Sequence, residues 1–306
     1  MQGRLERISP ATGRSSRLLQ WSDNLREVES VLDAGRAEVI TGFGDYWHYH
    51  VEMELTAFTH GEGAFFVGDY IGPFAAGEVF LIGENLPHHW NVRGPCAGLS
   101  AQWDFPPEHA FWALPETLSV VSLFQRAGHG IRYGGRTAAA VTAGLREIAG
   151  GSGLDRLGLL LRLLSLLADA PAAEQALLSR RQFALGTDSA HQEAISEAIR
   201  YLLGNFRHEI RLEELLRLTG MSKATFARQF RQHSGRTFTE FVARLRLQAA
   251  CRELVETDRT ILEIALSCGF NEVSFFNRLF RRVMSCCPTE YRARGRQQPK
   301  ATTQPP

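Results

Sequence analysis

The chain has 306 residues, a hydrophobic fraction of 44% and a net charge of +1, which predict a globular protein of two domains. The apolar stretches are shorter than the about 18 residues of a membrane span, and the N-terminus lacks the apolar core of a signal peptide. The five cysteines are irregularly spaced and do not indicate a disulfide framework. We therefore expect a cytoplasmic protein with no membrane partner.

The small net charge conceals an uneven distribution along the chain. From His191 to the C-terminus there are 19 Lys and Arg residues against 12 Asp and Glu residues, whereas the preceding part has 15 against 21. A basic C-terminal part that follows an acidic N-terminal part indicates one domain that binds nucleic acid and one that does not.

The N-terminal third of the chain has the character of a β domain. Between about residues 35 and 105, short apolar stretches such as residues 65–67 and 79–82 alternate with turn residues. Many short strands separated by turns predict a sandwich or a small barrel. The first forty residues are polar and mixed, and no strand is predicted there.

Histidines and a glutamate cluster within this β segment. His48, His50 and Glu54 have the same parity, so on a strand they project from one face. Together with Gly42 and Gly61 their spacing resembles the first sequence motif of the cupin fold. His88 then takes the place of the histidine of the second motif, where Gly83 and Asn85 replace the usual proline and glycine. The resemblance covers residues 41–92 and implies a cupin-like β-barrel whose inner face holds a ligand.

Three interpretations of this cluster remain open. His48, His50, Glu54 and His88 offer three imidazoles and a carboxylate, which suit a divalent metal such as Zn, Fe, Mn or Ni. The same four side chains, with Trp90, could instead line a metal-free pocket for a small effector such as a sugar or an organic acid. In the third interpretation the histidines are structural parts of the barrel core.

The segment of residues 106–170 has a helical pattern. Residues 137–149 and 154–168 predict two apolar helices, joined by a short glycine-rich turn and therefore paired antiparallel. Leucines along the second helix form either a core or a subunit interface. Residues 171–190 are predicted to be a linker, with a helix over residues 175–185 as an alternative.

The C-terminal part contains the same short pattern twice, between residues 212 and 294. Each copy reads as a short apolar helix, a glycine turn at Gly220 or Gly269, and a second helix. Ser222 and Asn271 are the predicted N-caps of the second helices. The inner faces of these helices carry two phenylalanines four residues apart, and the outer faces carry small, polar and arginine side chains. A helix over about residues 237–256 separates the copies.

The connecting helix sets the distance between the two copies. At about 1.5 Å per residue it is about 30 Å long, close to the about 34 Å of one DNA turn. The second helix of each copy can therefore enter one of two successive major grooves.

This repeat closely resembles the DNA-binding domain of the AraC/XylS family of transcription regulators, most specifically over residues 261–270, 274–282 and 288–292. The resemblance implies a transcription activator rather than an enzyme, with a homodimer formed through the helical segment and RNA polymerase as a partner. The base-reading positions it implies are Ala224, Ala227 and Arg228, then Val273, Ser274, Asn277 and Arg278. Lys223, Arg231, Arg281 and Arg282 complete the predicted DNA-binding set.

One residue departs from the family pattern. Ser285 stands after the second of these helices, where the family usually has glycine. A residue other than glycine at a helix end that needs positive φ costs about 1 kcal/mol.

The sequence thus predicts an α+β multidomain protein. Residues 1–105 form a cupin-like effector-binding domain, 106–170 a helical dimerisation segment, 171–190 a linker, 191–295 an all-α double helix-turn-helix domain and 296–306 a disordered tail. Its expected partners are double-stranded DNA, a small-molecule effector, RNA polymerase and a second copy of the chain. The alternative function is a metal-dependent cupin enzyme, such as an oxygenase or isomerase, fused to a DNA-binding domain.

Overall fold

The computed structural model describes residues 15–42, 44–183 and 191–297. The chain divides into two compact units. The first comprises the residues up to Glu197 together with Arg228–Gly235, and the second comprises Ala198–Ala227 and the residues from Arg236 onward. Residues 184–190 of the predicted linker and most of the predicted tail lie outside the described residues. Among the described helices, none is long and apolar enough to cross a membrane.

The first unit is built on a nine-stranded antiparallel sheet, in the order β3-β2-β1-β7-β4-β6-β8-β9, with β5 paired to β4. The path of paired strands begins at β3 and ends at β9, so over the described residues the sheet is not closed into the expected barrel. The β-rich N-terminal domain is confirmed. Its strands are β1 (Ser16–Trp21), β2 (Glu27–Asp33), β3 (Arg36–Thr41), β4 (Met53–Val67), β5 (Tyr70–Ala75), β6 (Val79–Ile82), β7 (His88–Trp103), β8 (Ile131–Tyr133) and β9 (Gln175–Leu177).

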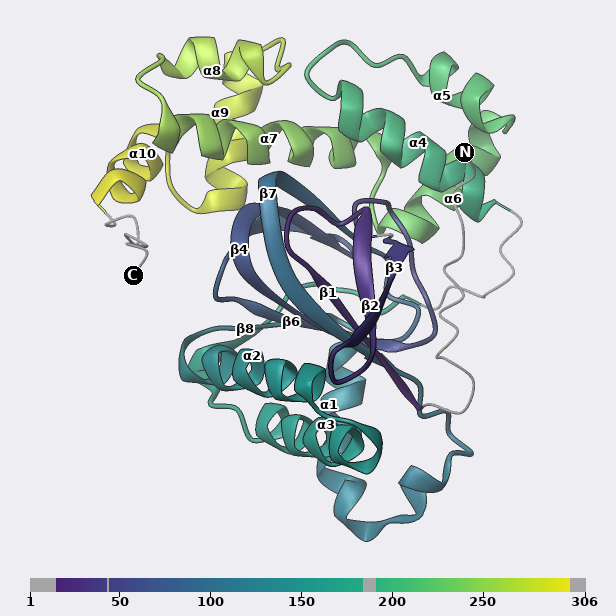
Figure 1. Cartoon of the computed structure of the whole chain (residues 1–306). Coiled ribbons are helices and arrows are strands. Elements are labelled where there is room, and N and C mark those ends of the chain that lie inside the picture. Colours follow the sequence, from purple (N-terminus) through teal and green to yellow (C-terminus); the bar gives the residue numbers. More distant parts are fainter. Residues whose placement is uncertain (1–14, 43, 184–190, 298–306) are drawn as a thin grey trace. The chain divides into compact units, whose positions relative to one another are not determined.

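The long, curved strands β4 and β7 pair along their whole length and form the centre of the sheet (Figure 1). Their register shifts on both sides of His60. Gly61 follows with φ of +97°, and a Cβ there would lie 2.8 Å from Cβ of Cys96. The last glycine of the cupin-like motif therefore stands where the strand bends and where a side chain has no room.

Four strands, β1, β2, β8 and β9, lie where the sequence predicted none, whereas β3 falls in the predicted β segment. Strand β1 lacks the expected alternation because residues on both of its faces are buried. Leu18 packs in the core on one face and Leu19 in the core on the other. Strands β8 and β9 have three residues each. Strand β9 lies in the predicted linker and pairs with β8, so residues 175–177 extend the sheet and do not begin a helix.

The helices of the first unit confirm the predicted pair. They are α1 (Leu118–Ala127), α2 (Gly135–Gly150) and α3 (Gly153–Ala168), and α2 and α3 lie side by side (Figure 1). Gly144 permits their close approach, because a Cβ there would lie 2.6 Å from Leu163. The predicted leucine stripe is split: Leu160 and Leu164 are buried in the core of the unit, whereas Leu154 and Leu161 are 80% and 36% exposed.

The C-terminal part is helical, as predicted. Its helices are α4 (Gln192–Asn205), α5 (Leu212–Thr219), α6 (Lys223–Ser234), α7 (Phe238–Glu256), α8 (Ile261–Ser267), α9 (Val273–Met284) and α10 (Pro288–Gln297). Thr237 and Thr260 begin α7 and α8, each with a capping box in which a glutamate three residues later returns a hydrogen bond. Helix α10 reaches Gln297, two residues into the predicted tail. Helix α7 has the predicted length, since 19 residues span about 28 Å.

Candidate DNA-binding helices and a buried histidine cluster

Helix α6 is the second helix of the first copy. Its start is fixed by Ser222, whose hydroxyl accepts a hydrogen bond of 3.2 Å from the backbone N–H of Thr225, as predicted. Gly220 has φ of +65° and makes the preceding turn. Phe226 and Phe230 are buried. The exposed side chains are Lys223, Ala224, Ala227, Arg228 and Arg231.

Helix α9 has the same inner face but a different start. Phe276 and Phe280 are buried, with their rings 5.5 Å apart. The N-cap is Glu272, which makes no side-chain capping bond, so the prediction that Asn271 caps this helix was wrong. Val273 is partly exposed, and the fully exposed members of the predicted set are Ser274, Asn277, Arg278, Arg281 and Arg282.

The end of α9 confirms the expectation for Ser285. This residue adopts a left-handed conformation with φ of +56°, and its N–H donates a 3.0 Å hydrogen bond to the carbonyl of Arg281. Gly235 has φ of +69° at the equivalent place after α6. The serine therefore ends α9 in a conformation that costs about 1 kcal/mol more for it than for glycine.

A groove of about 830 Å³ runs along the outer face of α9. Arg281 and Arg282 line it together with the start of α10 at Cys287 and Pro288. Val273, Asn277 and Arg278 line the same groove. Side chains predicted to read bases and side chains predicted to meet phosphates thus line one groove on the surface of the chain.

The structure brings His48, His50, Glu54 and His88 together, with their ligand atoms within 4.8 Å of one another. All four side chains are buried, at 5% exposure or less. The parity argument placed His48, His50 and Glu54 on one strand, and this was wrong. Glu54 is on β4 and His88 begins β7, His48 forms an isolated β-bridge with His88, and His50 lies in the loop between. Reciprocal backbone hydrogen bonds of 3.1 and 2.9 Å hold His48 beside His88.

Backbone carbonyls fix the orientation of the three rings. In each ring Nδ1 lies within 2.9 Å of a carbonyl oxygen. A carbonyl only accepts, so Nδ1 carries the proton, and Nε2 of a neutral ring is left with its lone pair. The pairs are His48 with Tyr46, His50 with Glu52, and His88 with Leu86.

Glu54 faces these nitrogens, and other side chains hold its carboxylate in place by hydrogen bonds. The Thr56 hydroxyl donates to its Oε1 at 2.6 Å, and Nε2 of Gln102 donates to its Oε2 at 2.8 Å. Arg17 in turn donates to Oε1 of Gln102 at 3.0 and 2.7 Å. The carboxylate oxygen Oε2 lies 3.2 Å from Nε2 of His50. The carboxylate is therefore positioned by donors that leave one side of it turned toward the imidazoles.

The electrostatics of the cluster favour a neutral His48 and a charged Glu54. Burial lowers the pKa of His48 well below its ordinary value. Burial by itself raises the pKa of Glu54, but the contacts with His50 and His88 outweigh it and hold this pKa well below its usual range. Nε2 of His88 is buried, has no hydrogen-bond partner and lies 3.8 Å from Oε2 of Glu54. A buried nitrogen lone pair near a carboxylate is unfavourable unless a cation or a proton lies between them.

Trp90, expected to line an effector pocket, lies in an aromatic cluster on the same face of the sheet. Its ring stacks on Phe65 at 3.7 Å and meets Phe58 and Phe80 edge-on, at 4.7 and 4.9 Å. It is 2% exposed. Packing within the domain thus occupies this ring.

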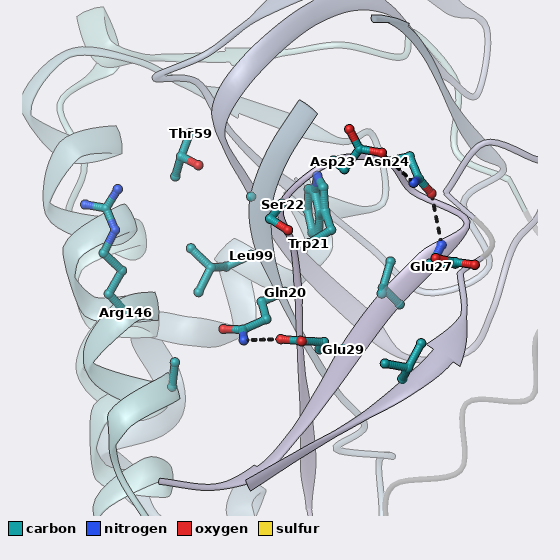
Figure 2. Close-up of a pocket in the computed structure, with 14 residues that line it drawn as sticks. Gln20, Trp21, Ser22, Asp23, Asn24, Glu27, Glu29, Thr59, Leu99 and Arg146 are labelled. Carbon is teal, nitrogen blue, oxygen red and sulfur yellow. Dashed lines mark hydrogen bonds between the residues drawn. The ribbon is translucent and has the colours of Figure 1, made fainter. Parts of the chain in front are cut away.

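A separate cavity of about 570 Å³ lies where β1 and β2 meet α2 (Figure 2). Figure 2 shows Gln20 donating to Glu29, at 2.5 Å, and Arg146 standing across from these strands. Its volume suits a small organic molecule. Asp23 and Glu27 also line it, so an anionic ligand would meet three carboxylates there.

Comparison with known proteins agrees with this arrangement. Residues 215–294 match a family model described as a helix-turn-helix domain. The HTH-type transcriptional activator RhaS of Pectobacterium carotovorum is 26% identical over 264 residues, which cover 80% of this chain and 86% of that protein. RhaS of Mannheimia succiniciproducens is 36% identical over 101 residues, covering 33% of this chain and 38% of that protein.

Among solved structures, a probable AraC family transcriptional regulator from Rhodopseudomonas palustris is 32% identical and covers 34% of this chain and 97% of that one, with a TM-score of 0.32. The matched model spans both copies of the repeat, and the alignment to RhaS of Pectobacterium carotovorum covers much more of this chain than the repeat alone. The repeat, its exposed reading faces and these relatives agree: the chain belongs to the AraC/XylS family of sequence-specific transcriptional regulators.

Proposed function

We propose that this protein activates transcription in response to a small ligand received by its N-terminal domain. The observation that carries the proposal is the pair of helices α6 and α9, each preceded by a glycine turn, which bury matching phenylalanines and expose matching arginines. Its relatives named RhaS are described as transcriptional activators, which supports activation and RNA polymerase as a partner.

In this proposal, some exposed side chains of α6 and α9 contact bases and others contact phosphates. Arg228 and Arg278 are exposed on corresponding positions of α6 and α9, and each can donate a bidentate pair to guanine. Asn277 can do the same for adenine, and Ala224, Ala227, Val273 and Ser274 fit against neighbouring base edges. Lys223, Arg231, Arg281 and Arg282 serve the phosphates.

In this proposal the N-terminal domain binds the small ligand. It is a cupin-like domain in the sense that an antiparallel sheet carries the histidine cluster on one face, on strands β4 and β7 and the loop before β4. His48, His50, Glu54 and His88, with Trp90 behind them, are the proposed effector or metal site. A ligand there regulates DNA binding only if it binds two states of the protein with different affinity.

A homodimer completes the proposal. Leu154 and Leu161 lie two turns apart on α3 and are both exposed, with Gly158 and Ser165 on the same exposed stripe. Small and apolar residues along one helix face allow a second helix to approach closely. Two copies of the chain joined here would present two double helix-turn-helix domains to one operator.

Selection of a binding site from random DNA by the full-length chain tests the proposed function. We expect a selected sequence bound about 10³-fold or more tightly than random DNA. The double variant Arg228→Ala with Arg278→Ala should lose this preference, and Arg162→Ala should keep it. Arg162 is a matched control because it removes one charge from the exposed face of α3, outside the DNA-binding helices. Failure to enrich any sequence would contradict the proposal.

The enzymatic alternative has its own measurement. A metal-dependent oxygenase or isomerase would turn over a small molecule at the histidine cluster, and His50→Ala would abolish that turnover. Turnover of candidate sugars or organic acids at a rate that DNA does not influence would favour the enzyme.

A further inference from the structure

We propose that the cavity between β1, β2 and α2 binds a cationic amino acid, a molecule with one carboxylate and two separated positive charges. The site is distinct from the histidine cluster, and binding there requires no part of the proposed function. Three features of the cavity point to this ligand: its volume of about 570 Å³, the opposite charges on its two sides and the apolar surface between them.

The cavity lies on the opposite face of the sheet from the histidine cluster. Leu99 of β7 lines it and belongs to the core that contains Leu145 of α2. Met53 and Leu55 belong to the same core, so the side chain of Glu54 between them points to the other face of β4. A ligand in this cavity is therefore separated from the cluster by the sheet.

The two sides of the cavity carry opposite charges (Figure 2). Glu27 and Glu29 lie on β2 and Asp23 follows β1, whereas Arg146 lies across from them on α2. Within the described ranges of the chain, the Arg146 guanidinium and the Glu27 carboxylate make no hydrogen bond or ion pair. A ligand with both kinds of charge can form charge-assisted hydrogen bonds to both sides.

Hydrogen bonds position the carboxylates on the strand side (Figure 2). Gln20 donates to Oε2 of Glu29 at 2.5 Å, and Nδ2 of Asn24 donates to Oδ2 of Asp23 at 3.0 Å. The other side-chain atom of Asn24, Oδ1, accepts a 3.0 Å hydrogen bond from the backbone N–H of Glu27. Glu27 is therefore fixed through its backbone, and its carboxylate is left to accept from a ligand.

The spacing of these carboxylates favours an organic cation over a metal ion. Among the described residues, the side chains close enough together to hold one ion are those of the histidine cluster, and Asp23, Glu27 and Glu29 form no such group. Two positive charges held apart by a carbon chain can meet carboxylates that do not converge on one point. Lysine, ornithine and arginine carry such a pair, on the α-amino group and at the end of the side chain.

The volume and the apolar lining suit the rest of such a molecule. About 570 Å³ lies in the range of pockets for small organic ligands. Val28, Leu99 and Ala149 line the cavity together with the charged side chains, and they offer apolar surface to a chain of methylene groups. The α-carboxylate is the part of the ligand that matches Arg146.

Matched ligands test each charge separately. Full-length protein is titrated with L-lysine, L-ornithine and L-arginine by calorimetry, and each is compared with the amine that lacks its carboxylate and the amino acid that lacks its side-chain charge. For lysine these are cadaverine and norleucine. We expect one site per chain and binding of at least one cationic amino acid about 10-fold or more tighter than of either relative. Absence of binding at millimolar concentration, or equal binding of the relatives, would overturn the proposal.

Matched variants locate the ligand. Arg146→Gln should remove the preference for the amino acid over its amine, and Glu27→Gln should reduce the preference over the uncharged side chain. Glu38→Gln on the neighbouring strand β3 and Arg162→Gln on α3 remove the same charges outside the cavity, and both should keep the wild-type preferences. All four side chains are exposed, so circular dichroism should show unchanged folding. Binding that Arg146→Gln and Glu27→Gln leave unchanged would overturn the site.

DNA selection by the same protein separates this site from the proposed function. A chain that selects DNA but binds none of the three amino acids would overturn the site and leave the proposed function intact. A chain that binds one of them with the expected preferences but selects no DNA would support the site and contradict the proposed function.

Discussion

Helices α6 and α9 have similar buried faces, but they begin and end differently. Helix α6 begins at a serine that caps it and is followed by Gly235, whereas α9 begins at Glu272 without a side-chain cap and ends at Ser285 with positive φ. Each of these differences disfavours α9 as an isolated helix. Helix α9 must therefore depend more on tertiary packing, which Phe276 and Phe280 provide.

The exposed faces of the two helices also differ, and on this face α9 has more hydrogen-bonding side chains than α6. Helix α6 offers Ala224 and Ala227 beside Arg228, while α9 offers Ser274 and Asn277 beside Arg278. Hydrogen-bonding side chains discriminate between bases more strongly than alanines do. In the proposed function we therefore expect α9, the less well terminated helix, to carry most of the sequence reading. The following variants test this expectation.

The largest effect is expected at the buried face of each helix. Phe226→Ala and Phe276→Ala each remove a ring that is at most 1% exposed, and each should cost about 3–5 kcal/mol of stability. Denaturant unfolding of the full chain measures this. Phe275→Ala, 42% exposed, is the control and should change stability by about 0.5 kcal/mol or less. Similar losses for Phe275→Ala and Phe276→Ala would contradict the assignment of the inner face.

Next in size is the loss of base contacts. Arg278→Ala should weaken binding to the selected DNA by about 1–3 kcal/mol and relax preference at one base position. Arg228→Ala should act similarly at a different position, and Arg281→Ala should weaken binding to all sequences because Arg281 is proposed to meet phosphate. Titration with specific and random DNA separates these cases. If Arg278→Ala lost equal affinity for both DNAs, it would not be a base-reading residue.

A smaller effect concerns the end of α9. Ser285→Gly should stabilise the chain by about 1 kcal/mol, because glycine adopts positive φ without strain. The reverse change, Gly220→Ser, introduces strain at φ of +65° where a Cβ meets nothing within 4 Å, and should destabilise by a similar amount. Thermal melting of both variants is the measurement. No gain for Ser285→Gly would show that the serine side chain compensates for its backbone.

The smallest effect is at the helix starts. Ser222→Ala should cost about 0.5–1 kcal/mol because it removes the cap of α6. Glu272→Ala should cost less, since this side chain makes no capping bond. A greater loss for Glu272→Ala in the same melting experiment would reverse the comparison between the two starts.

The repeat could be predicted closely because its signals are local. Glycine turns, caps and phenylalanines four residues apart act within a few positions, so the sequence located α5 to α9. The error there was the N-cap of α9, which is Glu272 and not Asn271. The sheet depends on distant pairing. Strand β9 pairs with β8 about forty residues away, and three residues carry no periodic signal. The grouping of the histidine cluster was predicted from motif spacing, but His50 reaches it from a loop, whose path depends on hydrogen bonds such as that from Asn85 N–H to its carbonyl.

The central claim is that α6 and α9 of one chain read two successive major grooves. Base-by-base analysis of the sequences selected by the full-length protein tests it most directly, repeated with Arg228→Ala and with Arg278→Ala. We predict two conserved blocks with centres about 10–10.5 base pairs apart, of which each variant relaxes a different one. A single conserved block, or two variants that relax the same block, would contradict the claim.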